Sequence, residues 1–221
     1  VIRKIYDMIP SNMENKKKRV IVKNIEHTAG HKQFSDYSDE FDYLVNSGVA
    51  LSVQAISNPK FPLKESESKN LIKLYLSDVG ILTDLLYRTN INAVLGDERS
   101  VNLGSVYESV VAQELHAHGF TLHYYDNKQR GEVGFLIDDY DNLTVLPIEV
   151  KSGKDYKVHS ALDAFLDTPD YHIKNAIVLS NEQNVHKEHG ITYLPVYYVM
   201  FLKQDNIPEE DLVIPNPTLQ A

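Results

Sequence analysis

The residues with the clearest potential for chemistry are two charged side chains at the end of one apolar run. Glu149 and Lys151 stand two residues apart within Pro147-Ile148-Glu149-Val150-Lys151-Ser152-Gly153. Side chains of a β-strand alternate between its faces, so this spacing puts the carboxylate and the ammonium on one face. The apolar residues beside them then point the other way, into a core. The pattern predicts a polar site, with a carboxylate next to an ammonium group, at the end of a buried strand.

The preceding apolar run, Glu132-Val133-Gly134-Phe135-Leu136-Ile137, predicts the neighbouring strand. Glu132 offers an acid to the same site, but the next position on its face is Gly134, which has no side chain. Glu132 is two residues, roughly 6 to 7 Å, along the strand from that position. Its long side chain can lean toward the gap without replacing a residue there. The glycine therefore limits how much chemistry the site can support.

The elements that must hold these residues follow from the hydrophobic pattern. Apolar residues at helical spacing predict a helix over 105–118, closed by Gly119, with Glu108 in its first turn. The order that follows is strand 122–125, strand 132–137, strand 144–151, helix 158–166, strand 176–179 and strand 191–198. The pattern predicts an α/β (α+β) chain with a mixed sheet flanked by helices.

A different pattern occupies the N-terminal part. It predicts a helix over 2–9 ended by Pro10, an alternating stretch at 20–25, a helix over 34–46 and an extended stretch over 49–56. This order resembles a winged-helix unit. Asn58-Pro59-Lys60-Phe61-Pro62 and the polar run 64–70 together make a natural linker, and Ser77-Asp78 is a candidate helix cap.

Composition separates the same two parts. Residues 1–64 carry ten Lys or Arg against seven Asp or Glu, and residues 65–221 carry twelve against twenty-four. An acidic larger part disfavours strong nonspecific binding of nucleic acid, because phosphate neutralisation needs clustered cations. The chain has no cysteine, which excludes disulfides, thiolate metal sites and a catalytic thiol. No apolar run approaches the length of a membrane span, so we expect no membrane partner and a cytoplasmic location.

Four motifs in order carry a family resemblance. They are Lys73-Leu74-Tyr75-Leu76-Ser77-Asp78-Val79-Gly80-Ile81-Leu82, Val106-Tyr107-Glu108-Ser109-Val110-Val111-Ala112-Gln113-Glu114-Leu115, Glu132-Val133-Gly134-Phe135-Leu136-Ile137 and Ile148-Glu149-Val150-Lys151-Ser152-Gly153. Together they resemble a prokaryotic family of AAA-type ATPases whose C-terminal part is an uncharacterised domain similar to PD-(D/E)XK nucleases. No G-x-x-x-x-G-K-[ST] motif occurs, so we expect no nucleotide site in these residues.

The resemblance implies a restriction-endonuclease-like fold and a set of roles. Glu149 and Glu108, with Glu132 as a displaced acid, would hold Mg²⁺ or Mn²⁺, and Lys151 would orient or deprotonate the attacking water. Glu149, Lys151 and Glu108 are then the candidate catalytic residues. The family's pattern at the second strand is Glu-Val-Asp-Phe, so its metal-binding aspartate falls on Gly134. With that carboxylate missing, we expect a degraded metal site and a weak or inactive nuclease.

The resemblance also implies a division of the chain and a set of partners. We expect a winged-helix-like domain over 1–64, a nuclease-like domain over 65–204 and a C-terminal tail over 205–221. The expected partner is the protein's own ATPase module, which precedes such domains, with DNA and a second copy of the chain as further candidates.

Three functions remain open from the sequence. The first is a regulatory or interaction module of an AAA-type ATPase, and the second is an active Mg²⁺-dependent DNA endonuclease using Glu108, Glu132, Glu149 and Lys151. The third is a winged-helix DNA binder that uses the basic run Lys16–Arg19. Taken singly, each charged residue is most simply a solvated surface group, and only the order of the motifs favours a nuclease-like domain.

Overall fold

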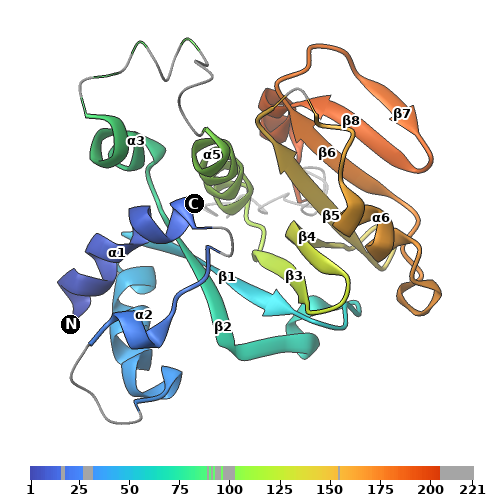
Figure 1. Ribbon diagram of the computed structural model, residues 1–221. Coiled ribbons are helices and arrows are strands. Elements are labelled where there is room, and N and C mark those ends of the chain that lie inside the picture. The colour runs from blue at the N-terminus through green and yellow to red at the C-terminus, as the bar shows by residue number, and fades with distance from the viewer. Residues whose placement is uncertain are drawn as a thin grey trace, which may run out of the picture.

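One mixed eight-stranded sheet runs through the part of the chain that the computed structural model describes (Figure 1). The described residues are 1–15, 18–26, 32–88, 90, 92, 96, 103–153 and 155–204. The strands, in the order in which they pair, are β2 (Glu67–Leu76), β1 (Ala50–Ile56), β3 (His123–Asn127), β4 (Gly131–Asp139), β5 (Thr144–Lys151), β6 (Ala176–Ser180), β8 (Ile191–Pro195) and β7 (His186–Glu188). Parallel pairs join β1 to β3, β5 to β6 and β6 to β8. The predicted fold class, a mixed sheet flanked by helices, is confirmed.

Helices cover both faces of the sheet. They are α1 (Ile2–Glu14), α2 (Ser38–Asn46), α3 (Val79–Tyr87), α5 (Gly104–Ala117) and α6 (Ser160–Leu166). In Figure 1, α5 stands between α1–α3 on one side and the strands β5–β8 on the other. Two hydrophobic clusters result. One holds α5 with α1 and α2, and the other forms under α6.

The central unit positions the candidate site. It runs α5, β3, β4, β5, α6, β6, with β3, β4 and β5 antiparallel and β6 parallel to β5. Phe135 and Ile148 belong to the cluster under α5, whereas Val133 and Leu136 belong to the cluster under α6. The β4–β5 ladder ends at the pair Phe135–Ile148. The end of β5, with its two charged residues, therefore extends beyond the paired part of β4.

The N-terminal strands belong to this same sheet. β1 and β2 form an antiparallel hairpin, and β1 also pairs in parallel with β3. The boundary expected after residue 64 falls between the two strands of that hairpin, so the two expected units share one sheet. The predicted linker over 64–70 is wrong in its last residues, because β2 begins at Glu67. Pairing with β1 turns this polar run into a strand. The expected tail, 205–221, lies outside the described residues.

Most helix ends match the sequence, with two exceptions. Asp78 caps α3 by accepting a hydrogen bond from the Gly80 amide at 2.6 Å, and Gly119 takes a left-handed φ of +87° after α5, as predicted. The expected stop at Pro10 is wrong, because α1 continues to Glu14 and buries Pro10 within its packed face. The packing of that face outweighs the one hydrogen bond that proline removes. The expected first-turn position of Glu108 is also wrong, since α5 begins at Gly104 and its first turn holds no acid.

Two further observations complete the fold. The short edge strand β7 was not predicted, because three residues, His-Lys-Glu, give no hydrophobic pattern of their own. None of the helices in the described part of the chain is long and apolar enough to cross a lipid bilayer.

Candidate functional site

The first part of the candidate site is the charged end of β5. The Nζ atom of Lys151 lies 3.0 Å from Oε1 of Glu149, and the Gly134 amide donates a hydrogen bond to Oε2 of the same carboxylate at 3.2 Å. Ile148, which precedes Glu149, and Val150, which lies between the two charged residues, are both buried, as the predicted alternation requires. We call Glu149 and Lys151 the strand-end pair. It is open to solvent in part, with side-chain exposures of 15% for Glu149 and 29% for Lys151.

Gly134 borders this pair and leaves room for a side chain. A Cβ atom at Gly134 would lie 3.5 Å from the Ile148 carbonyl oxygen and 3.9 Å from Oε2 of Glu149. Both are ordinary contact distances. Gly134 is also absent from the glycines with positive φ, so its backbone suits an L-residue. An aspartate at this position would place a second carboxylate next to that of Glu149.

The second part of the candidate site lies among α5, β2, β3 and β4. Glu132 does not lean toward Gly134, because its Oε1 atom lies 2.5 Å from Nζ of Lys73. Lys73 is fully buried on β2, and its ammonium group also lies 4.5 Å from the ring centroid of Tyr124. Burial raises the pKa of Glu132, and the neighbouring Lys73 charge partly opposes that shift.

Glu108 joins this second group rather than the first. It pairs with Lys18, and its Oε2 atom accepts a hydrogen bond from the Tyr75 hydroxyl at 3.2 Å. Burial raises the pKa of Tyr75 well above its ordinary value, and the charges of Glu108 and Glu132 add to the effect. Nearby, Nη1 of Arg19 lies 3.2 Å from Oδ2 of Asp126. Burial also raises the pKa of Tyr124, as do the charges of Asp126 and Glu132.

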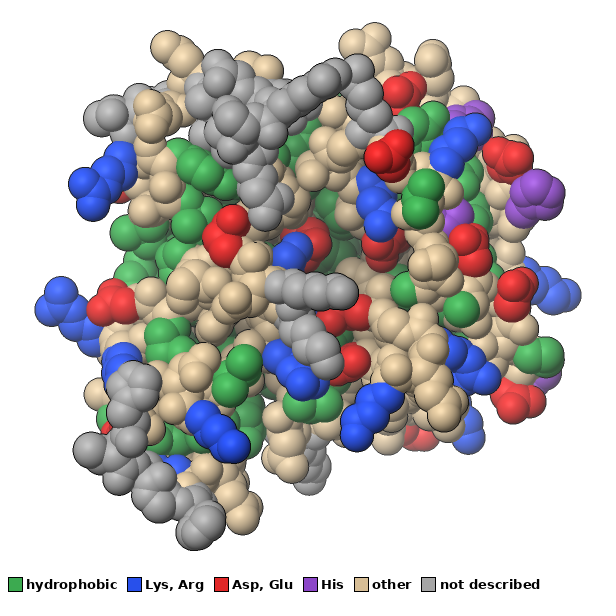
Figure 2. Space-filling model, in the orientation of Figure 1, with side chains coloured by type: hydrophobic (Ala, Val, Ile, Leu, Met, Phe, Trp, Pro, Cys, Tyr) green, Lys and Arg blue, Asp and Glu red, His purple; other side chains and the backbone are tan. Residues whose placement is uncertain are grey.

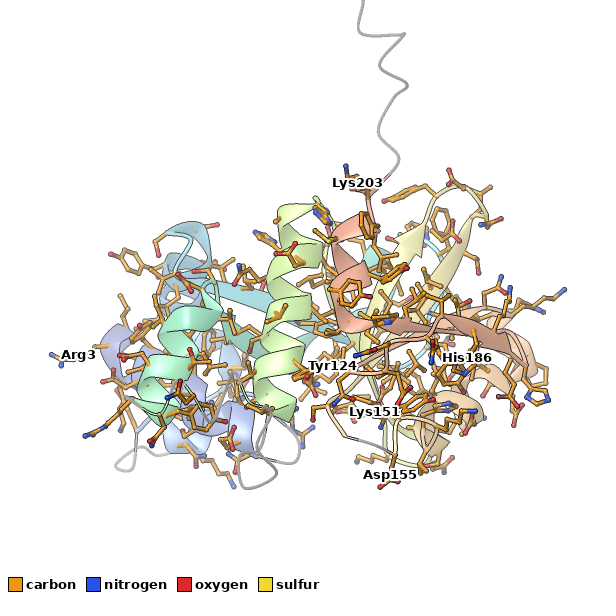
Figure 3. All side chains as sticks on the ribbon, turned by 90° about the horizontal axis from the view of Figure 1, so that it is seen from above. Arg3, Tyr124, Lys151, Asp155, His186 and Lys203 are labelled. Atoms are coloured by element: carbon orange, nitrogen blue, oxygen red, sulfur yellow. The ribbon has the colours of Figure 1, made fainter. Side chains whose placement is uncertain are left out.

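We call this second group the inner cluster. Its members are Lys18, Arg19, Lys73, Tyr75, Glu108, Tyr124, Asp126 and Glu132. Figure 2 shows acidic and basic side chains next to one another near the middle of one face, over the region where α5, β3 and β4 meet. Figure 3 labels one residue of each group, Tyr124 of the inner cluster and Lys151 of the strand-end pair.

The structure thus divides the predicted site residues between two places. Glu149 and Lys151 come together as predicted, whereas Glu108 and Glu132 meet in the inner cluster. Among the described residues, no group of three acids or histidines is placed to hold a metal ion. The predicted ligand set of Glu108, Glu132 and Glu149 is therefore not assembled. Each of these carboxylates has a lysine ammonium group beside it.

Sequence reasoning named some residues of the inner cluster but did not predict that they come together. The available signal was Lys73, a lysine at an inward position of the apolar run Leu71-Ile72-Lys73-Leu74-Tyr75-Leu76. A buried lysine needs an anionic partner, because an uncompensated charge in a core is costly. Nothing local to the run indicates that this partner is Glu132, which lies 59 residues later.

Two families match this chain. Residues 103–199 match a domain of unknown function (DUF4143), and residues 1–92 match another domain of unknown function (DUF8612). Domains of the first kind are commonly found C-terminal to AAA ATPase domains. No curated protein and no solved structure matches the chain.

The two matched segments meet at the inner cluster, and each contributes charges of one sign to it. All of its cations, Lys18, Arg19 and Lys73, come from the first segment. All of its acids, Glu108, Asp126 and Glu132, come from the second. The strand-end pair, by contrast, lies wholly within the second segment. The acids of one segment are therefore neutralised by the basic residues of the other.

Proposed function

We propose that this chain is a nuclease-like accessory module of an AAA-type ATPase, with a regulatory or docking role and little or no nuclease activity. The match of residues 103–199 supports the association with an ATPase, since such domains are commonly found C-terminal to AAA ATPase domains. The order α5-β3-β4-β5-α6-β6 supports the nuclease-like fold. The ATPase module of the same protein is the partner that this proposal implies.

The observation that carries the proposal is the pairing of every candidate metal ligand with a lysine. Mg²⁺ prefers hard oxygen ligands in near-octahedral geometry, usually one or two carboxylates completed by water. Glu108 and Glu132 are each engaged with a lysine in the inner cluster. Glu149 pairs with Lys151 and lies beside Gly134, where the family that the sequence resembles has its metal-binding aspartate. The residues present therefore do not fit a catalytic Mg²⁺ site.

The direct test compares metal binding by three proteins. We expect no binding of Mn²⁺ by the unaltered chain in calorimetric titrations up to millimolar concentrations. Gly134→Asp should bind Mn²⁺ at least tenfold more tightly, because it places two carboxylates side by side. Adding Glu149→Gln to Gly134→Asp should abolish that gain. Tight binding of Mn²⁺ by the unaltered chain would contradict the proposal.

The strand-end pair favours a second candidate function, an active metal-dependent DNA endonuclease. Glu149 and Lys151 keep the Glu-x-Lys spacing of such enzymes, and their 3.0 Å contact lies at a partly exposed strand end. This function would give Mn²⁺-dependent cutting of plasmid DNA that disappears in Lys151→Ala. The same assay on the unaltered chain separates the two functions, because the accessory module is expected to leave the plasmid intact.

DNA binding through the basic run at 16–19 has weaker support. Lys18 and Arg19 are both engaged with acids of the inner cluster, and Lys16 and Lys17 lie outside the described residues. Binding that weakens steeply with salt and is lost when residues 16–19 are neutralised would favour this role.

A further inference from the structure

A buried histidine lies where the two matched segments join. The side chain of His123, on β3, is buried, and its Nε2 atom lies 2.9 Å from Oε1 of Glu67, at the start of β2. Glu67 belongs to the first matched segment and His123 to the second. Their contact therefore crosses the junction at which β1 pairs in parallel with β3.

The other ring nitrogen of His123 lacks a partner. His123 is paired with Gln54 of β1 in the parallel ladder, so the two side chains lie on one face of the sheet. Nδ1 of His123 and Oε1 of Gln54 are both buried, and neither has a hydrogen-bond partner among the described residues. A protonated imidazole carries an N–H group on each nitrogen. Glu67 accepts from one of these groups, and a rotation of the Gln54 side chain supplies an acceptor for the other.

A second carboxylate lies near the same ring. Asp138, on β4, is two residues beyond Leu136, which pairs with His123, so its side chain lies on the same face. Burial raises the pKa of Asp138, and the hydrogen bond from the Leu63 amide and the charge of His123 both act against that shift. His123 therefore lies near two acids, one on each side of β3.

The neighbouring elements add no competing cation to this group. The short helix η3 (Leu63–Ser66) carries Lys64 and Glu65, and both are exposed. β1 presents Gln54, which does not titrate. Among the described residues, neither of the two acids near His123 forms an ion pair with a lysine or an arginine.

We propose that His123 is a pH-sensitive link between the two matched segments, strongest when its imidazole is protonated. The protonated ring forms an ion pair with Glu67 and attracts Asp138, whereas the neutral ring keeps only a hydrogen bond to Glu67. The contribution of this link to stability is therefore present at acidic pH and is lost as pH rises and the ring gives up its proton. The link does not depend on the proposed function, because neither residue of the strand-end pair takes part in it.

Hydrogen exchange at the junction tests the link. The Gln54 amide donates to the Leu122 carbonyl oxygen at 3.2 Å, between β1 and β3, and reports the opening of this junction. After correction for the intrinsic pH dependence of exchange, its protection factor should be about fivefold higher at about pH 5.5 than at about pH 8, on either side of the ordinary histidine value. Equal protection at both pH values would overturn the link.

Two variants assign the effect to His123. His123→Gln removes the titrating group and keeps a side chain that can donate to Glu67, so it should abolish the fivefold difference. His116→Gln is the matched control, because His116 is exposed on α5, and it should keep the difference. If His123→Gln does not fold, as judged by circular dichroism, Glu67→Gln replaces it and should abolish the difference as well. A difference that persists in the folded variant would overturn the link.

Nitrogen NMR of the histidine rings gives an independent readout, because it distinguishes a protonated ring nitrogen from a bare one. The ring of His123 should carry two N–H groups at the lower pH and one at the higher. A single N–H group at both pH values would show that the ring stays neutral, with the Gln54 amide donating to Nδ1, and would refute the proposal.

Discussion

The inner cluster and the strand-end pair both bring carboxylates next to basic side chains, but they differ in burial and in which segments supply the residues. In the inner cluster, acids and cations come from different matched segments, and Lys73 is fully buried. In the strand-end pair, both residues come from one strand, both are partly exposed, and Gly134 leaves space beside them. The comparison indicates that carboxylates of one sheet can join the two matched segments in one place and stay within a single strand in another.

The largest effect is expected from Lys73→Met. The change leaves Glu132 without its cation and close to the charges of Glu108 and Asp126. The charge left without its partner is on Glu132, whose side chain is 30% exposed, so the free energy of unfolding should fall by about 2 kcal/mol. Urea denaturation measures this loss. Lys157→Met is the matched control, because its pair with Glu188 is half exposed and its loss should cost less than about 0.5 kcal/mol.

A smaller loss is expected from Tyr75→Phe. The variant keeps the ring, which lies 5.9 Å from that of Phe135, but loses the hydroxyl that donates to Glu108. Glu108 keeps its pairing with Lys18, so the cost should be about 1 kcal/mol. Tyr43→Phe removes a hydroxyl from an exposed tyrosine and should leave the urea midpoint unchanged. If the two variants behave alike, Tyr75 contributes only its ring to stability.

Glu149→Gln should change stability less than either Lys73→Met or Tyr75→Phe. The amide oxygen can still accept the Gly134 hydrogen bond, and only the charge attraction to Lys151 is lost. A partly exposed pair is worth little, so we expect a loss of about 0.5 kcal/mol in the same denaturation experiment. A loss as large as that of Lys73→Met would show that the strand-end pair is as essential to the fold as the inner cluster.

The contribution of Glu132 to stability should depend on pH, which tests how strongly the inner cluster is buried. Because burial raises its pKa in the folded chain, ionised Glu132 is less favourable there than in the unfolded chain. Its contribution to stability therefore falls as pH rises from the ordinary glutamate value of 4.5 through the raised pKa. Carboxyl NMR titration checks the direction, and Lys73→Met should raise the pKa of Glu132 further. A pKa of Glu132 below the ordinary value would show instead that the attraction of Lys73 outweighs the effect of burial.

Much of the central unit could be predicted from sequence. The helix expected over 105–118 and the strands expected over 132–137 and 144–151 correspond to α5, β4 and β5 within a few residues. Their apolar periodicity is strong because each packs a whole face or both faces into a core. β2 and β7 were missed because edge strands with polar residues become strands only through their partners, β1 and β8.

The sequence by itself determined the pairing of Glu149 with Lys151, because strand alternation places residues two apart on one face. It also determined the absence of a side chain at Gly134. Only the tertiary structure decided that Glu132 and Glu108 turn toward Lys73 and Lys18. Contacts between residues 59 and 90 positions apart depend on which strands and helices become neighbours. No local pattern carries that information, since the free energy of a buried charge depends on what the whole fold brings beside it.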